Sequence, residues 1–318
     1  MPKIASYDDV KANRLVRELP VGKGWRTNFL TYPEGTNLAE EPMGFLVEGN
    51  YERVIRPHYH ENDQFQVVVS GGGVLGKHKL SIHAVHFSRA YTPYGPINFG
   101  ADGLGFLTLR ARKDPGAQYI SDAREKLVAV ADRKPWQVTE APDFTRSGDV
   151  SLRPFTQIKD ERGLAAFSLS MAPNAAVILP DPSQTGGQHI IVTKGSLSYQ
   201  DREYKGLAVA FVKTHEGAWQ ITAGSEGLEA IVLNYPRREA PAAANDSFQH
   251  PLEGYAVIAK SPQHRVWQCM LCAFTYDEAK GMPDEGVAAG TRWEDVPETW
   301  TCPDCSASKS DFQMEVVG

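Results

Sequence analysis

The residues that could do chemistry fall into two groups that lie far apart in the sequence. The first group comprises all four cysteines of the 318-residue chain, which form two Cys-x-x-Cys pairs: Cys269 and Cys272, then Cys302 and Cys305. Each pair can form a tight turn, and four thiolates together make a tetrahedral site that selects zinc or iron. Zinc ribbons separate such pairs by about 15 to 20 residues. Here 29 residues lie between Cys272 and Cys302, which favours iron.

The second group is a cluster of histidines, because five of the nine in the chain fall between positions 58 and 86. His58 and His60 are two residues apart, so in a strand both project from one face, and Gln64 shares their parity. Two imidazoles followed by an amide oxygen can form one side of a metal pocket. The pattern alone fits a polar barrel mouth that binds only water equally well.

Short β-rich segments separated by glycine, proline and asparagine must position the histidines. Their alternating pattern and the turn residues between them, as in FQVVVSGGGVLG and HIIVTKGSLSYQ, predict antiparallel sandwiches or barrels. Helical periodicity is present only in SDAREKLVAVADR and in DDVKANRLVREL. We therefore expect a mainly β protein.

Residues 265–318 resemble rubredoxin over the full length of that domain. The matching segments are CMLCAFTYD, GMPDEGVAAGTRWEDVPETWTCPDC and KSDF. An aromatic set that would form the core around the metal matches as well: Trp267, Phe274, Tyr276, Trp293, Trp300 and Phe312. The resemblance implies one iron ion on the four cysteines, which changes oxidation state by one electron and does no catalysis itself. A zinc ion in a structural site is the alternative.

Two positions depart from the rubredoxin pattern. The family has a glycine after the second cysteine of each pair, where this chain has Ala273 and Ser306. This position tends to require a positive φ, so a side chain there costs about 1 kcal/mol. A side chain can also change solvent access to the sulfurs and the reduction potential.

The segment RPHYHENDQFQVVVSG resembles the first cupin motif, with His58, His60 and Gly71 in register. Gln64 stands in place of the usual glutamate. The segment VHFSRAYTPYGPI resembles the second motif, in which Tyr94 occupies the slot of a third histidine. The resemblance implies a second iron, or another divalent metal ion, on His58 and His60.

Gln64 and Tyr94 each have two possible roles at such a site. Gln64 is a further metal ligand or orients bound O2, and Tyr94 is a fourth ligand or a proton donor, which makes these two the candidate catalytic residues. His86, eight residues before Tyr94, could instead turn inward as a third imidazole ligand.

The cupin register repeats once, more weakly. Aligning Gly195 with Gly71 places Gln188 at the position of Gln64, and no histidine stands at a ligand position. This repeat resembles a second cupin barrel without a metal site, in which we assign His189 to structure. The expected architecture is two cupin barrels of the double-stranded β-helix (jelly-roll) type, followed by a small rubredoxin-like domain. The expected boundaries are 1–140 for the first barrel with the candidate metal site, 141–236 for the second, 237–264 for an Ala- and Pro-rich linker and 265–318 for the rubredoxin domain.

The formal net charge of −6 lies entirely in the C-terminal part of the chain. Residues 265–318 contain ten acidic and four basic residues, a net of −6, while the preceding residues contain 29 of each sign. An acidic surface argues against nucleic acid and favours a basic partner, such as a rubredoxin reductase or a similar electron donor. Cupins often pair through their sheets, so the resemblance also implies a homodimer.

The sequence contains no sign of a membrane or export segment. No apolar run approaches the ~20 residues of a membrane span, and the N-terminus lacks the apolar stretch of a secretory signal. We therefore expect a cytoplasmic protein that does not bind membranes.

Electron counting gives the expected chemistry. A ring-cleaving dioxygenase takes all its electrons from its substrate, whereas a monooxygenase-like step needs two from outside, and a tethered one-electron carrier suits the second. We therefore predict a non-haem iron oxidoreductase, an oxygenase that uses O2 and a small organic substrate, with aromatic compounds among the candidates. The rubredoxin domain would deliver electrons to the cupin iron. One alternative is an electron carrier or redox-responsive binding protein whose cupin is non-catalytic. Another is a cupin dioxygenase whose rubredoxin only re-reduces the iron.

Overall fold

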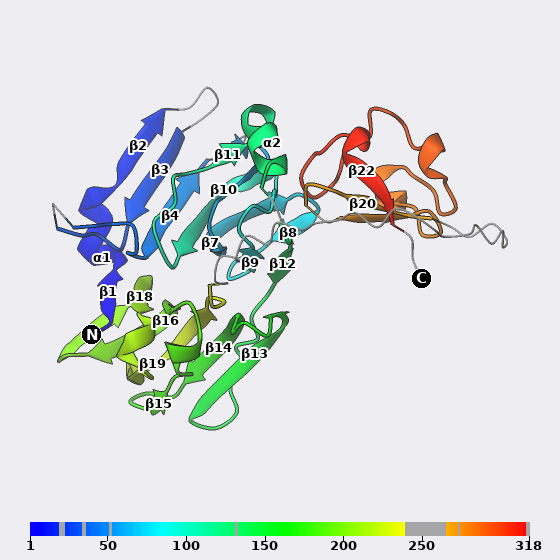
Figure 1. Cartoon of the computed structure of the whole chain (residues 1–318). Coiled ribbons are helices and arrows are strands. Elements are labelled where there is room, and N and C mark those ends of the chain that lie inside the picture. Colours follow the sequence, from blue (N-terminus) through cyan, green and yellow to red (C-terminus); the bar gives the residue numbers. More distant parts are fainter. Residues whose placement is uncertain are drawn as a thin grey trace, which may run out of the picture. The chain divides into compact units, whose positions relative to one another are not determined.

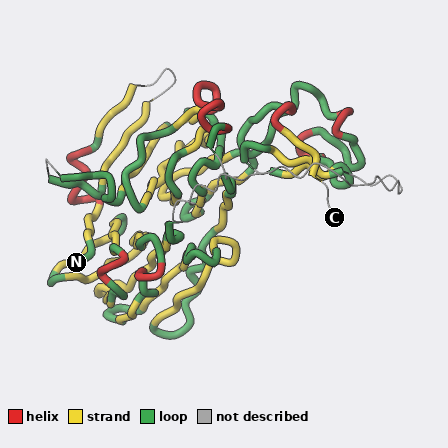
Figure 2. Tube along the Cα trace, in the orientation of Figure 1, coloured by secondary structure: helices red, strands yellow, loops and turns green. Residues whose placement is uncertain are grey.

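The computed structural model describes residues 1–18, 23–33, 36–50, 53–130, 133–238, 265–272 and 274–315. The chain is mainly β, as expected, and it divides into a large unit that ends at Arg237 and a small C-terminal unit, each described by itself. Figure 2 shows that strands outweigh helices in the large unit. The expected linker at 237–264 lies outside the described residues except for its first two positions. Among the described helices, none has the length and apolarity that crossing a bilayer would need.

The first sheet of the large unit is antiparallel and has nine strands (Figure 1). Its strands are β2 Leu15–Glu18, β3 Lys23–Asn28, β4 Met43–Gly49, β5 Val54–Ile55, β7 Gln64–Leu75, β8 His78–Leu80, β9 Val85–Ser88, β10 Ile97–Arg110 and β12 Gln137–Glu140. The order along the main path is β12-β9-β7-β10-β4-β3-β2, while β5 pairs with β10 and β8 pairs with β7. A separate two-stranded sheet, which carries the first candidate histidine, consists of β6 His58–Tyr59 and β11 Gln118–Tyr119.

The second sheet has eight strands and is also antiparallel. Its strands are β1 Lys3–Ser6, β13 Val150–Lys159, β14 Ala165–Met171, β15 Ala176–Ile178, β16 Gln188–Tyr199, β17 Arg202–Lys205, β18 Ala208–Val212 and β19 Gln220–Asn234. The order is β1-β18-β16-β19-β14-β13, while β15 pairs with β19 and β17 with β16. Because β1 pairs with β18, the chain begins in the second sheet, although the expected boundary assigned residues 1–140 to the first barrel.

Both sheets contain the same bulge, which agrees with the internal repeat in the sequence. Gly71 in β7 has a φ of 63°, and a Cβ there would lie 2.1 Å from the carbonyl oxygen of Gly103. Gly195 in β16 has a φ of 69°, and a Cβ there would lie 2.1 Å from the carbonyl oxygen of Gly227. Glycine alone fits either position without moving the backbone. The alignment of Gly195 with Gly71 therefore holds in three dimensions.

A shared apolar core joins the two sheets. It contains buried residues from both, among them Phe65, Phe87, Leu107, Ile158, Ile191, Leu233 and Tyr235. Each sheet also has an interior cluster of its own. The interior cluster of the first sheet includes Tyr94, Ile97 and Phe106, so the candidate site lies against rigid, packed strands.

The described residues contain two α-helices, both short: α1 Tyr7–Val10 and α2 Ile120–Val128. α2 overlaps SDAREKLVAVADR, where a helix is expected, and begins one residue before it. The expectation for DDVKANRLVREL is wrong beyond its start, because α1 is followed by a 3-10 turn at Lys11–Asn13 and then by β2. β2 pairs with β3 at the edge of the sheet, and this tertiary pairing outweighs the weak helical periodicity.

The small unit is built around a cluster of packed aromatic rings. Its strands are β20 Val266–Cys269, β21 Thr275–Asp277 and β22 Phe312–Glu315, in the order β21-β20-β22. The ring of Trp293 lies 5.2 Å from that of Trp267, 5.6 Å from that of Trp300 and 4.8 Å from that of Phe312. Phe274 and Tyr276 complete the cluster. The aromatic set expected from the sequence therefore does form the core of this unit.

Candidate functional site

The four cysteines converge in the small unit. All four are buried, and their sulfur atoms lie within 4.8 Å of one another. Two equivalent turns shape the site, in which the amide of Cys269 donates to the carbonyl of Phe274 and the amide of Cys302 donates to the carbonyl of Ala307. Four thiolates at this spacing fit one tetrahedrally coordinated ion. Within the described ranges, this is the one group of three or more His, Cys, Asp or Glu side chains that converges so closely.

Ser306 adopts the left-handed backbone expected at its position. Its φ is 58°, and its side chain is exposed. The residue therefore bears the strain that a glycine would avoid. Ala273, at the equivalent position of the first pair, lies outside the described residues.

His58 and His60 lie next to each other, with their ring centroids 5.2 Å apart at nearly a right angle. Nδ1 of His58 donates to the carbonyl oxygen of Arg56 at 2.8 Å, and Nδ1 of His60 donates to Oδ1 of Asp114 at 2.7 Å. Each ring therefore carries its lone pair on Nε2. Burial lowers the pKa of His58 to about 3 and also lowers the pKa of His60, so both rings are neutral at neutral pH.

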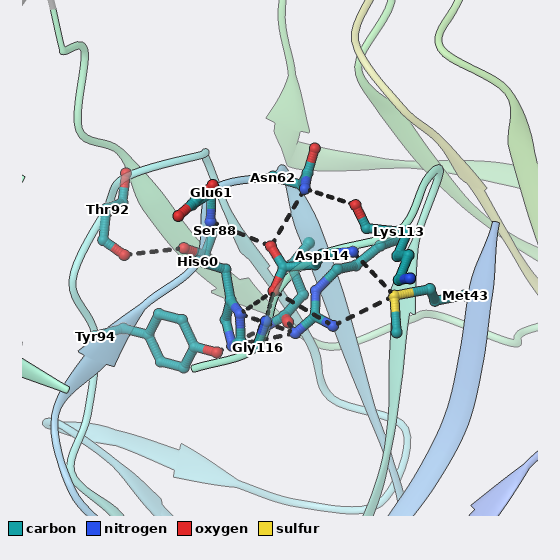
Figure 3. A network of polar contacts seen from close by, with 12 residues as sticks. Met43, His60, Glu61, Asn62, Ser88, Thr92, Tyr94, Lys113, Asp114 and Gly116 are labelled. Atoms are coloured by element: carbon teal, nitrogen blue, oxygen red, sulfur yellow. Dashed lines mark hydrogen bonds and ion pairs between the residues drawn. The ribbon is translucent and has the colours of Figure 1, made fainter. Parts of the chain in front are cut away.

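Asp114 fixes the orientation of His60 and of the loop beside it (Figure 3). Its carboxylate also accepts from the backbone amides of Glu61 at 3.2 Å and Gly116 at 2.9 Å, and from the side chain of Asn62 at 3.2 Å. Burial alone would raise the pKa of this carboxyl, but the hydrogen bond from His60 and the charge of Arg110 outweigh burial and lower the pKa to about 2. Asp114 is therefore a fixed negative charge behind His60.

Arg110 inserts a buried guanidinium group among the candidate ligands. Its Nη2 lies 3.1 Å from Nε2 of His60, to which it donates, and it also donates to Oε1 of Gln64. Its Nη1 lies 3.9 Å from Oδ1 of Asp114. Burial lowers the pKa of Arg110, yet the guanidinium remains charged at neutral pH because the ordinary pKa of an arginine lies far above 7.

Gln64 and Tyr94 form one hydrogen-bonded pair beside the histidines. Nε2 of Gln64 donates to the hydroxyl oxygen of Tyr94 at 2.6 Å. The ring of Tyr94 lies 4.6 Å from that of His58, and the side chain is fully buried. The structure thus brings together four of the residues proposed from the sequence.

His86 is not brought to the other two histidines. Its Nδ1 lies 2.9 Å from the hydroxyl of Thr139, its Nε2 is buried without a partner, and it does not line the cavity that contains His58 and His60. Its ring faces Tyr94 at 5.2 Å. Tyr94 therefore lines the cavity beside the histidine pair, and His86 does not.

A cavity of about 380 Å³ opens beside these groups. The residues described above that line it are His58, His60, Gln64, Tyr94, Arg110 and Asp114. Its walls also include aromatic and aliphatic side chains and two further arginines: Trp25, Phe45, Val47, Ile55, Phe106, Tyr119, Arg26 and Arg53. This volume is within the roughly 300–1,000 Å³ range of small-molecule sites.

Arg110 and Asp114 are the functional residues that sequence reasoning missed. Arg110 ends β10 and Asp114 follows it in a loop, about fifty positions after the residues they contact. One signal was present: a charged residue closing the apolar run LGFLTLR, at the same parity as Thr108, which also lines the cavity.

The two imidazoles are arranged as metal ligands usually are, but the guanidinium of Arg110 competes with a metal ion for them. Histidines that bind metals usually donate their second nitrogen to a carboxylate or a backbone carbonyl, as His60 and His58 do here. The guanidinium of Arg110, however, occupies the acceptors of His60 and Gln64. Metal binding at the two histidines therefore requires Arg110 to leave them, because two cations at this distance repel each other.

Comparison with solved structures supports the fold of the large unit. A variant of oxalate decarboxylase from Bacillus subtilis superimposes with a TM-score of 0.50 at 12% identity, covering 74% of this chain and 77% of that one. A second oxalate decarboxylase structure gives 0.50 at 11% identity, covering 75% and 78%. At these identities the likeness concerns the fold, which is that of two cupin barrels in one chain.

Comparison with sequences identifies the small unit. The rubredoxin family model matches residues 266–312. Rubredoxin-1 of Pseudomonas aeruginosa is 64% identical over 54 residues, 17% of this chain and 98% of that protein, and Rubredoxin-2 of the same organism is 62% identical over 50 residues, 16% and 91%. The chain belongs to the rubredoxin family through its C-terminal domain, an electron carrier fused to a larger part with the bicupin fold.

Proposed function

We propose that the chain is a non-haem iron oxidoreductase, an oxygenase in which the rubredoxin domain supplies electrons to an iron ion held by His58 and His60. The observation that carries the proposal is the pair of neighbouring imidazoles, each with Nδ1 already donated, so that Nε2 is the nitrogen left for a metal once Arg110 leaves His60. Both rings line a cavity large enough for a small organic molecule. Iron held there would supply one-electron redox chemistry beside the bound substrate.

Tyr94 is the proton donor in this proposal. Burial raises the pKa of its phenol, so the hydroxyl keeps its proton at neutral pH, which disfavours the alternative role as a phenolate ligand. The hydroxyl oxygen accepts from Gln64, so the proton of Tyr94 is left for a ligand in the cavity. Gln64 thus acts by orienting Tyr94.

The covalent link between the two parts gives the rubredoxin domain a purpose in this scheme. A monooxygenase-like reaction needs two external electrons per turnover, and a rubredoxin carries one at a time. A carrier on the same chain is present at a high effective concentration, so successive transfers do not wait for diffusion. The acidic residues of the domain, ten against four basic ones, favour a basic reductase as the upstream donor.

A second function is favoured by one observation, the position of Arg110. Its guanidinium already donates to His60 and Gln64, so the barrel could serve as a binding domain without a metal. The chain would then be a rubredoxin-type electron carrier, or a redox-responsive binding protein, with a non-catalytic cupin.

Iron content after anaerobic loading of the full chain separates the two functions. The oxygenase predicts two iron ions per chain in the wild type and one in His60→Ala, with the visible iron–thiolate absorption intact in both. Arg153→Gln, on an exposed pair with Asp143 in the second sheet, is the control and should match the wild type. A single iron in the wild type supports the binding protein. Substrate-dependent O2 uptake that persists without reductant over many turnovers supports a dioxygenase that uses the rubredoxin only for repair.

A further inference from the structure

The cavity of the first sheet carries an excess of positive charge. Arg26, Arg53 and Arg110 line it, while Asp114 is the one carboxylate among its described lining residues. Three guanidinium groups against one carboxylate leave a net of +2 on the walls. A ligand of negative charge complements such a site.

Arg110 is the deepest of these charges and has donor capacity left over. It is 3% exposed and is held in place by Gln64, His60 and Asp114. A guanidinium has five N–H donors, and its Nε–H has no acceptor among the described residues. Gln66, another lining residue, has a buried side-chain oxygen without a partner. Buried polar groups left in this way are rare, and they mark a place where a ligand or water completes the network.

Part of the remaining wall is apolar and includes flat aromatic rings. Trp25, Phe45, Phe106 and Tyr119 line the cavity together with aliphatic side chains. The guanidinium of Arg26 lies over the ring of Phe45 at 3.6 Å, so one wall combines charge with an aromatic face. Rings of this kind stack on planar ligands.

A neighbouring cavity of about 440 Å³ differs in charge. It shares Arg26, Met43 and Phe45 with the first cavity, but its lining also includes Glu41 and Lys113 and none of the candidate catalytic residues. The second cavity is therefore not equivalent to the first.

We propose that the cavity of the first sheet binds a small carboxylate with a flat apolar body, an aromatic carboxylate, with its charged end at Arg110. A carboxylate accepts paired N–H bonds from a guanidinium more effectively than any neutral group does. The hydroxyl of Tyr94, whose oxygen accepts from Gln64, would then point its proton towards the ring of the bound molecule. The inference rests on the proposed function and deepens it, because it names the substrate class of the same site.

Equilibrium binding to the full chain tests the proposal without turnover. Calorimetric titrations would use protein treated with a chelator that empties the barrel and leaves the iron–thiolate absorption unchanged. Benzoate, benzamide and benzylammonium are the probes, because they share one ring and differ in charge. Benzoate is expected to bind about tenfold or more tightly than benzamide, and benzylammonium is expected not to bind.

Variants of the cavity assign the effect to Arg110. Arg110→Gln should reduce benzoate affinity about tenfold or more and bring it to the level of benzamide, while Arg110→Lys should retain part of the difference. Arg53→Gln removes a charge from the cavity wall and leaves the hydrogen bonds of His60 intact, so it should reduce the benzoate affinity by a smaller factor. If Arg110→Gln does not fold, this variant tests whether the positive charge of the cavity binds benzoate. The surface variant Arg153→Gln is the matched control and should bind benzoate as the wild type does.

Each outcome separates this inference from the proposed function. Equal affinities for benzoate and benzamide, or no binding of any probe, overturn the carboxylate assignment even if the chain holds two iron ions. Selective benzoate binding in a chain that takes up one iron ion supports the assignment while the oxygenase fails.

Discussion

Nδ1 of His60 lies 2.7 Å from Oδ1 of Asp114, and this one contact links the proposed metal site of the cavity to its proposed anion site. It holds the His60 ring with Nε2 facing Arg110, and it places a negative charge within 3.9 Å of the guanidinium. Asp114 also accepts hydrogen bonds from the backbone amides of Glu61 and Gly116, so its carboxylate cannot rotate away from His60 without losing these two hydrogen bonds.

Asp114→Asn should lower the affinity of the barrel for divalent metal about 10- to 100-fold, because the amide orients His60 without raising the basicity of its ring. Calorimetry with Co²⁺ on chain whose rubredoxin iron is intact measures the change. Glu61→Gln, an exposed neighbour, is the matched control. Unchanged affinity in Asp114→Asn would show that His60 does not bind the metal.

Arg110→Met should have the opposite effect on metal and raise its affinity, by about tenfold or more, since the variant removes a cation that donates to His60 and Gln64. The same Co²⁺ titration reports it, with Arg153→Gln as control. A lower affinity in Arg110→Met would mean that the guanidinium supports the metal site and does not compete with it.

Tyr94→Phe removes the phenolic proton and leaves the imidazoles in place. Under the proposed function it should reduce kcat about 10²- to 10⁴-fold while the iron content stays at the wild-type level. Steady-state O2 uptake and metal analysis of the same preparation give both values. An unchanged rate would remove the proton-donor role, and a loss of iron would restore Tyr94 as a ligand.

His189 offers a prediction on stability. The side chain is fully buried in the second sheet with both ring nitrogens unpartnered in the described structure, and burial lowers its pKa to about 3. Replacing it with an apolar side chain in His189→Leu should raise the free energy of unfolding at pH 7 by about 1–3 kcal/mol.

The pH dependence of this effect follows from the direction of the shift. The folded pKa lies below the ordinary value of 6.5, so below pH 6.5 the unfolded chain takes up a proton that the folded chain refuses. Wild-type stability should therefore fall as the pH drops from about 6.5 towards 3, and more steeply than in His189→Leu. Chemical unfolding at a series of pH values measures both curves, and parallel curves would contradict the prediction. His215→Leu, on a short 3-10 turn, is the control.

The small unit could be predicted almost completely from the sequence because its determinants are local. The spacing of Cys269, Cys272, Cys302 and Cys305 fixes the ligand set, and the aromatic residues between them have no other core to join. The positive φ of Ser306 could be predicted because rubredoxins have a glycine at this position.

The large unit could be predicted less fully because its site is assembled by long-range pairing. The sequence placed His58, His60 and Gln64 together, and all three do line one cavity. The strand parity behind this expectation does not apply, because β6 ends at Tyr59 and β7 begins at Gln64. Parity could not cross the turn before Tyr94, which left the choice between Tyr94 and His86 open. Arg110 and Asp114 reach the site through the pairing of β10 with β7 and the loop that follows, so no local pattern joined them to the histidines.

The central claim is that electrons pass from the rubredoxin domain to the barrel within one chain. Its most direct test is a stopped-flow experiment in which the fully reduced, iron-loaded chain is mixed with O2 and substrate, and the return of the oxidised iron–thiolate absorption is followed. Benzoate-class carboxylates serve as trial substrates. The account predicts fast reoxidation at a rate independent of protein concentration, and slow reoxidation in His60→Ala. Equal rates in the wild type and His60→Ala, across the substrates and concentrations tried, would contradict it.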